Sequence, residues 1–252
     1  MEPEAAPLLH IDHVTIDYDG FKALNDLDLT LQKSSLTVVI GPNGAGKSTM
    51  CDAIIGRVRP SAGKVVFRGE VISKLPEHQI VGRGICRKFQ TPGVLIALTV
   101  MENILIAGAK ERVWWKSLTP KVSDAEMARA EEILAMVGLS ERRNVLAGEL
   151  AHGEKQWLEI GMVVATDAEL LLLDEPTAGM GAQESSQTAD IIRNLVGKHS
   201  VLVIDHDISF VEQLNGHVVV LHQGALFKQG QLADIRNDED VAAIYLGRAH
   251  KK

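Results

Sequence analysis

The sequence predicts an α/β fold with a mostly parallel sheet, helices on its faces and a helical insertion. Short apolar runs at residues 36–40, 170–173 and 201–204 have the composition of strands buried on both faces. Helical patterns separate these runs, and strands that alternate with helices indicate a parallel sheet. Residues 91–166 are mostly helical in pattern, so we expect them to form a lobe inserted into the sheet domain.

Antiparallel strands are expected at both ends of the chain. Residues 8–31 alternate in a β-like pattern with a turn at 18–20, and further β segments are expected at 64–72 and 85–90. A hairpin is predicted over residues 217–229 around Gln223–Gly224. We therefore expect a single domain over residues 1–252. In it, residues 8–90 and 167–247 form the core and a β lobe, and residues 91–166 form the helical lobe.

Three helices can be placed from local signals. Ser123 followed by Glu126 is a capping-box pattern, which predicts a helix that begins there and ends near Val137. A second helix is expected to begin near Glu154, and a third to cover residues 183–198.

Composition narrows the class of protein. The 252 residues are 46% hydrophobic and 23% charged with a net charge of -7, which is ordinary for a globular protein and gives no sign of nucleic-acid binding. Cys51 and Cys86 have no metal-ligand spacing, so we expect two buried thiols in a reducing compartment. The start of the chain lacks the charge pattern of a secretory signal, and no apolar run reaches the roughly 20 residues of a membrane span.

A glycine-rich loop follows the first buried strand and precedes a helix. Such glycines let backbone amides surround phosphate oxygens, and the helix N-terminus faces that charge. Lys47 is expected to reach the β- and γ-phosphates, and Ser48 to contribute its hydroxyl to Mg²⁺. The predicted nucleotide-binding residues are Gly41, Pro42, Asn43, Gly44, Ala45, Gly46, Lys47, Ser48 and Thr49.

Two acids end the apolar run at residues 170–173. Because ligands bind at the carboxyl edge of open parallel sheets, both acids are placed near the phosphate loop. Asp174 is expected to hold Mg²⁺, and Glu175 to orient and deprotonate the attacking water. The alternative interpretation is a solvated acidic turn.

The order and spacing of these motifs resemble the ATP-binding subunits of ABC transporters over about residues 8–247. The resemblance implies an ABC-type phosphate-loop core with ATP and Mg²⁺ as cofactors. It places Tyr18, or failing that Phe21, against adenine, Gln90 between Mg²⁺ and a membrane subunit, and His206 against the γ-phosphate. It also assigns the signature segment, which completes the site of a second ATPase subunit, to Ala151, His152, Gly153 and Glu154.

The function implied by this resemblance is ATP hydrolysis that energises solute import. The chain would dock on membrane permease subunits at the cytoplasmic face of the membrane and pair with a second, non-identical ATPase. Residues 178–180 and 244–248 resemble importers of branched-chain amino acids and urea, while residues 19–27, 87–92 and 155–162 look most like the urea subunit. Urea or a short-chain amide is therefore the expected solute, with branched-chain amino acids as the alternative.

Three positions depart from the family pattern. Ala151 replaces a serine and Glu154 a glutamine in the signature segment, and Gly181 replaces an aspartate that senses the opposite site. We expect intact chemistry in the chain's own site and a weakened contribution to the site of the other ATPase. Neutral change at these positions is the competing interpretation.

The apolar residues 94–98 are expected either to form a docking groove for membrane-subunit helices or to pack inside the helical lobe.

Two other classes of function remain. One is a soluble ABC ATPase acting on ribosomes or DNA, and the other is a module that binds ATP without cutting it.

Overall fold

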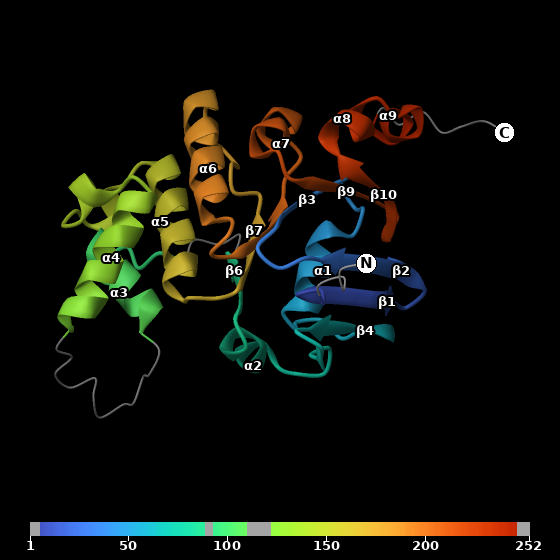
Figure 1. Ribbon diagram of the computed structural model, residues 1–252, viewed down its shortest axis with the longest axis horizontal. Coiled ribbons are helices and arrows are strands. Elements are labelled where there is room, and N and C mark those ends of the chain that lie inside the picture. The colour runs from blue at the N-terminus through green and yellow to red at the C-terminus, as the bar shows by residue number, and fades with distance from the viewer. Residues whose placement is uncertain (1–5, 89–92, 110–121, 246–252) are drawn as a thin grey trace.

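The computed structural model describes residues 6–88, 93–109 and 122–245. Across those ranges, six strands form a mostly parallel sheet in the order β10-β9-β3-β8-β7-β6 (Figure 1). Only the β9–β10 pair is antiparallel among them. The strands are β3 Leu36–Ile40, β6 Ile85–Lys88, β7 Leu170–Asp174, β8 Ser200–Ile204, β9 His217–His222 and β10 Ala225–Gln231.

A second sheet is antiparallel and has the order β2-β1-β4-β5 in the described part of the chain. Its strands are β1 Leu9–Tyr18, β2 Phe21–Leu31, β4 Ala62–Phe67 and β5 Glu70–Val71. The mixed α/β fold with one mostly parallel sheet and an antiparallel β lobe is therefore as predicted.

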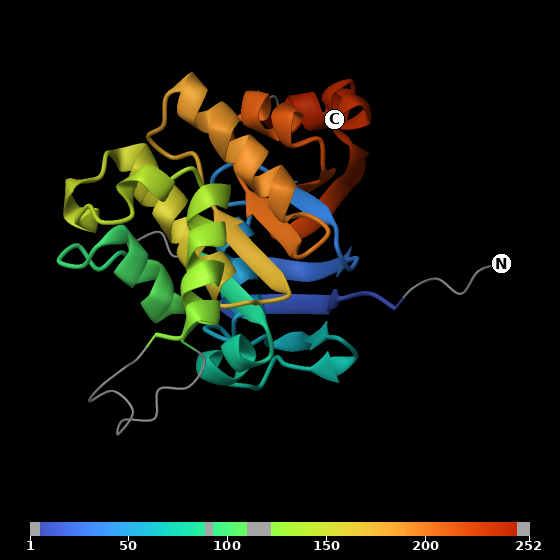
Figure 2. The same cartoon turned by 60° about the vertical axis from the view of Figure 1, so that its left-hand side comes forward.

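Three of the helices form a group of their own. In both views α3, α4 and α5 lie together on one side, and the antiparallel sheet lies beyond the parallel strands from them (Figures 1 and 2). The helices are α1 Lys47–Ile54, α2 Glu77–Gly82, α3 Val100–Gly108, α4 Asp124–Met136, α5 His152–Ala165, α6 Ala182–Leu195, α7 Ile208–Leu214, α8 Leu232–Arg236 and α9 Glu239–Tyr245, with short 3-10 turns at Ser140–Arg142 and Ala147–Glu149.

The capping box predicted at Ser123 is present. Its hydroxyl accepts from the Glu126 amide at 3.2 Å, and the Glu126 carboxylate accepts from the Ser123 amide at 2.8 Å. The Ser123 hydroxyl also donates to the Glu126 carboxylate at 2.7 Å, and this bond, together with the one from the Ser123 amide, holds the pKa of Glu126 below its ordinary value. α3 begins in the same way with Thr99 and Glu102, which the sequence analysis did not identify.

The central strands serve two hydrophobic cores, because successive side chains point to opposite faces of a sheet. In β7, Leu171 and Leu173 pack with the helices α3 to α7, whereas Leu170 and Leu172 pack with α1 and the β lobe. This explains why the strand is apolar at every position before Asp174. The sheet is thereby sandwiched, with its carboxyl edge left for polar residues.

Both cysteines are free thiols. Cys51 is buried on α1 and Cys86 is partly buried on β6, and burial raises the pKa of each thiol. Across the described ranges, the helices are all too short or too polar to span a bilayer.

Candidate nucleotide-binding site

The phosphate loop joins β3 to α1 and leaves the start of that helix open. Gly46 is the N-cap of α1 with a φ of 99°, no side chain caps the helix, and no acid occupies its first turn. Backbone N–H groups at an uncapped helix N-terminus need acceptors, and the helix dipole favours negative ones. This end of α1 is therefore suited to a phosphate group.

Two glycines of the loop are required by close backbone contacts. A Cβ on Gly41 would lie 2.4 Å from the Leu221 carbonyl oxygen, and one on Gly46 would lie 2.6 Å from the Ala23 carbonyl oxygen. Both residues also have positive φ values, which L side chains rarely adopt. The loop is therefore pressed between β9 and β2, and its backbone is exposed on the remaining side.

Lys47 lies across the loop. Its Nζ donates to the carbonyl oxygens of Gly41 at 2.7 Å and Pro42 at 3.0 Å. Partial burial lowers the pKa of this ammonium, and the nearby carboxylates of Glu175 and Asp174 oppose that shift. The ammonium thus lies on the phosphate loop itself, and its contact with the β- and γ-phosphates stays a prediction.

A cavity of about 230 Å³ brings the predicted motifs together. Phe21 contributes to its wall, whereas Tyr18 lies opposite Phe21 across the β1–β2 hairpin, and both rings are exposed. The lining residues are Phe21, Ala23, Asn43, Gly44, Ala45, Gly46, Lys47, Ser48, Thr49, Asp174, Glu175 and Ile204.

Asp174 ends β7 and is buried. Its Oδ2 accepts from Arg87 Nη2 at 2.7 Å, and Arg87 Nη1 donates to Asp52 Oδ1 at 2.6 Å. The sequence analysis assigned no role to Arg87, although a cation within the strand expected at residues 85–90 was a usable signal. Asp174 and the Ser48 hydroxyl line one cavity and offer the hard oxygen ligands that Mg²⁺ prefers, so they fit this ion. Gln90, the third predicted ligand, lies outside the described residues.

Glu175 and His206 approach each other from the ends of neighbouring strands. Glu175 Oε1 lies 3.7 Å from His206 Nδ1, and both side chains are well exposed. Glu175 adopts a φ of 46°, which is uncommon for a residue with a side chain, and its amide donates to the Ile204 carbonyl at 2.8 Å. The backbone therefore turns sharply at the predicted catalytic base.

The loop that carries His206 is fixed by a residue that the sequence analysis missed. Asp205 is buried and accepts from the amides of His206 at 2.7 Å and Asp207 at 3.0 Å. Its second oxygen accepts from the Thr177 hydroxyl at 2.8 Å. The turn after β7 and the turn after β8 are thus held by one carboxylate.

The signature segment lies at the start of α5 and does not line the phosphate-loop cavity. Ala151 is the N-cap and has no side-chain acceptor to offer. The Glu154 carboxylate instead accepts from the Ala151 amide at 2.9 Å and pairs with Arg142 Nε at 3.1 Å. Its charge is directed to the chain's own helix start and is largely offset by Arg142.

The signature segment also contacts the turn that contains Gly181. His152 Nε2 donates to the Ala178 carbonyl at 2.9 Å. A Cβ on Gly153 would lie 2.3 Å from Glu184 Oε1, while Glu184 Oε2 accepts from the Gly181 amide at 2.9 Å. The departures at Ala151, Glu154 and Gly181 are therefore neighbours in space.

The apolar segment at residues 94–98 has features of both predicted roles, which are docking of membrane-subunit helices and internal packing. Val94 is buried, but Leu95 and Ile96 are 44% and 66% exposed. The fully buried Asn103 fixes the backbone of Leu95 on both sides, accepting from its amide at 2.8 Å and donating to its carbonyl at 3.1 Å. An exposed apolar pair is thus displayed on a rigid loop.

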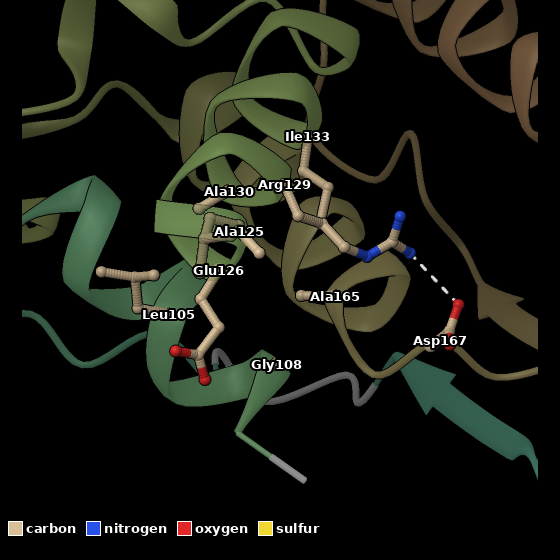
Figure 3. Close-up of a pocket in the computed structure, with 10 residues that line it drawn as sticks. Leu105, Gly108, Ala125, Glu126, Arg129, Ala130, Ile133, Ala165 and Asp167 are labelled. Carbon is tan, nitrogen blue, oxygen red and sulfur yellow. Dashed lines mark hydrogen bonds and ion pairs between the residues drawn. The ribbon is translucent and has the colours of Figure 1, made fainter. Parts of the chain in front are cut away.

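A larger cavity, of about 510 Å³, lies between α3, α4 and α5. Figure 3 shows Arg129 reaching across its rim to Asp167, an ion pair of 3.2 Å. Apart from Glu126, the remaining wall is aliphatic or glycine, and it contains no phosphate-loop or signature residue and neither Asp174 nor Glu175. The larger of these two cavities is therefore not the candidate nucleotide site.

Comparison with known proteins agrees with this geometry. Residues 24–178 match the family model described as ABC transporter. The chain belongs to the ABC transporter ATP-binding family. It is 34% identical over 252 residues to the high-affinity branched-chain amino acid transport ATP-binding proteins BraF of Pseudomonas aeruginosa and LivG of Escherichia coli. Each alignment covers 96% of this chain and 99% of the relative.

Solved structures give the same result for the fold. Two structures of MJ1267, an ATP-binding cassette of an ABC transporter, match with TM-scores of 0.84 and 0.83 at 27% identity. The first covers 96% of this chain and 99% of MJ1267, and the second, an ADP conformation, covers 97% and 100%. The predicted family and fold are confirmed, and the chain is an ATP-binding protein and ATP hydrolase. The relatives do not support urea and favour the alternative solute.

Proposed function

We propose that this chain hydrolyses ATP to energise the import of branched-chain amino acids. The observation that carries the proposal is the cavity in which the phosphate loop, Asp174 and Glu175 meet. The solute follows from the relatives, which are named for branched-chain amino acid transport and match over 99% of their length. Urea takes second place, because the segments that favoured it mark a lineage and contact no solute.

The chain's own residues have distinct roles in this proposal. Loop amides and Lys47 bind the phosphates of ATP, while Ser48, Asp174 and Gln90 hold Mg²⁺. When bound, Mg²⁺ offsets phosphate charge. Glu175 orients the attacking water and accepts its proton, and His206 contacts the γ-phosphate. Phe21 is the better placed aromatic for adenine, because it lines the cavity and Tyr18 does not.

The signature segment is proposed to act on a second, non-identical ATPase subunit. This fits its position away from the chain's own phosphate loop. Because Ala151 has no hydroxyl and Glu154 is bound to the helix start, its contribution to the other site is weak. The chain's own site would be completed by the signature segment of the other subunit.

Permease subunits are proposed to dock over Leu95 and Ile96, which would place the chain at the cytoplasmic face of the membrane. Leu95→Asp and Ile96→Asp should abolish transport yet preserve ATP binding by the purified chain. Loss of folding in both variants, seen by circular dichroism, would instead assign these residues to packing.

The test of the whole proposal combines uptake with hydrolysis. Cells that lack this gene would be complemented with the wild-type chain, Lys47→Ala or Glu175→Gln, and uptake of labelled leucine and labelled urea would be measured. We expect leucine uptake to be restored by the wild-type chain alone. Restoration of urea uptake without leucine uptake would reinstate urea as the solute. ATP binding without any hydrolysis in the complete transporter would indicate a regulatory subunit.

A further inference from the structure

Arg87 is a buried cation between two elements of the nucleotide site. It lies on β6, donates through Nη2 to Asp174 Oδ2 at 2.7 Å, and donates through Nη1 to Asp52 Oδ1 at 2.6 Å. Only 6% of its side chain is exposed, and it does not line the phosphate-loop cavity. Arg87 therefore reaches the chemistry only through other residues.

The two carboxylates that Arg87 joins belong to the elements that carry two of the three proposed Mg²⁺ ligands, Ser48 and Asp174. Asp52 and Ser48 are four residues apart on α1, and residues at this spacing share one helical face. Asp174 is the last residue of β7. The guanidinium thus ties α1, which carries Ser48, to the end of β7, which carries Asp174.

The geometry of the bridge also determines which oxygen of Asp174 is used. A guanidinium is planar and donates along fixed directions, so it orients a carboxylate more firmly than an ammonium does. Arg87 engages Oδ2, which leaves Oδ1 as the oxygen that it does not hold. A buried carboxylate is costly unless it is paired, and Arg87 pairs with Asp174.

We propose that Arg87 is a positioning residue for the metal site, which orients Asp174 and sets its distance from Ser48 so that the nucleotide binds together with Mg²⁺. This inference rests on the proposed Mg²⁺-ATP chemistry. Residues that orient a metal ligand typically change metal affinity by about 10–100-fold when they are replaced.

The next residue on the strand provides a matched control. Lys88 is equally buried but pairs with Glu159 of α5 at 3.1 Å, so it serves the helical lobe and not Asp174. Lys88→Met removes a buried cation from the same strand and leaves the Arg87 bridge in place. Its effects measure what the loss of a buried ion pair does to this region in general.

The test measures binding of a fluorescent ATP analogue to the full chain during titration with Mg²⁺, and again in excess chelator. Arg87→Met should raise the Mg²⁺ concentration for half-maximal binding about 10–100-fold, with affinity in chelator within about twofold of wild type. Arg87→Lys and Asp52→Asn should give smaller shifts in the same direction, and Lys88→Met should leave the Mg²⁺ dependence unchanged. Thermal unfolding would be followed in parallel for every variant.

Two results would overturn the inference. One is an equal loss of affinity with and without Mg²⁺ in Arg87→Met, and the other is a Mg²⁺ shift no larger than that of Lys88→Met. If Arg87→Met does not fold, wild-type Mg²⁺ dependence in both Arg87→Lys and Asp52→Asn would have the same meaning. Failure of the wild-type chain to bind the analogue at all would contradict the proposed function instead.

Discussion

Two helix starts in this molecule are prepared in opposite ways. α1 begins after Gly46 with no side-chain cap and no acid in its first turn. α5 begins after Ala151 with Glu154 in its first turn, and that carboxylate binds the Ala151 amide and Arg142. Both starts belong to segments that we predict to act at nucleotide sites, α1 in the chain's own site and α5 in the site of a second subunit.

Under the proposed function, this difference would let the chain keep one phosphate site while its contribution to another is weakened. An open helix N-terminus attracts an anion from outside, whereas a start that already holds a carboxylate has less to offer. α1 therefore needs a ligand to complete it, and α5 is already completed by its own side chain. The chain's own nucleotide site and its contribution to another subunit can thus change independently.

The largest effect is expected from removing the proposed catalytic base of the nucleotide site at the start of α1. Glu175→Gln should lower ATP hydrolysis by about 10²–10⁴-fold, because a general base contributes that much, while ATP binding is kept. Phosphate release and nucleotide binding would be measured on the same preparation. Hydrolysis at more than a tenth of the wild-type rate would show that Glu175 is not the base.

A smaller effect should come from opening the α5 start. Ala151→Ser with Glu154→Gln supplies a hydroxyl and removes the carboxylate, so turnover of the assembled two-ATPase complex should rise severalfold, at most on the order of tenfold. The purified chain without the second ATPase serves as the control and should not change. An unchanged rate in the complex would mean that the departures at α5 are neutral.

A third helix start, that of α4, carries a complete capping box and is expected to contribute to stability. Ser123→Ala removes half of the capping box of α4 and should lower the free energy of unfolding by about 1 kcal/mol, measured by denaturant unfolding. Because the bonds from the Ser123 hydroxyl and amide to the Glu126 carboxylate lower its pKa below 4.5, the part of the stabilisation that needs the ionised carboxylate is present above that pH and is lost as pH falls through the folded value. An effect of the same size at pH 7 and well below pH 4 would contradict this assignment.

The smallest effect is expected from Ala151→Ser alone. A serine at this N-cap can accept from the Glu154 amide and complete the box that α3 and α4 already have. We expect a gain of about 0.5 kcal/mol in the free energy of unfolding, since Glu154 already satisfies one donor. A loss of stability would show that the hydroxyl points elsewhere.

Local patterns predicted much of this molecule. The glycine loop, the acids after β7 and the Ser123 box are encoded within a few residues, so the sequence alone placed them. The contacts that were missed join distant positions: Arg87 with Asp174, and Glu184 with Gly153. The direction of Glu154 depends on Arg142, a neighbour in space twelve residues away. The relatives favour the alternative solute over urea, and the segments behind the urea prediction indicate a lineage without contacting a solute.

The state of the two thiols has a practical consequence for spectroscopy. Cys51 and Cys86 are the only cysteines in the chain, and burial disfavours the thiolate form of both. A maleimide spin label or fluorophore should therefore react far faster with a cysteine introduced on the surface than with either native one. Pairs of such labels, one on the β lobe and one on α4, would then report how the two lobes move during a nucleotide cycle against an almost silent background.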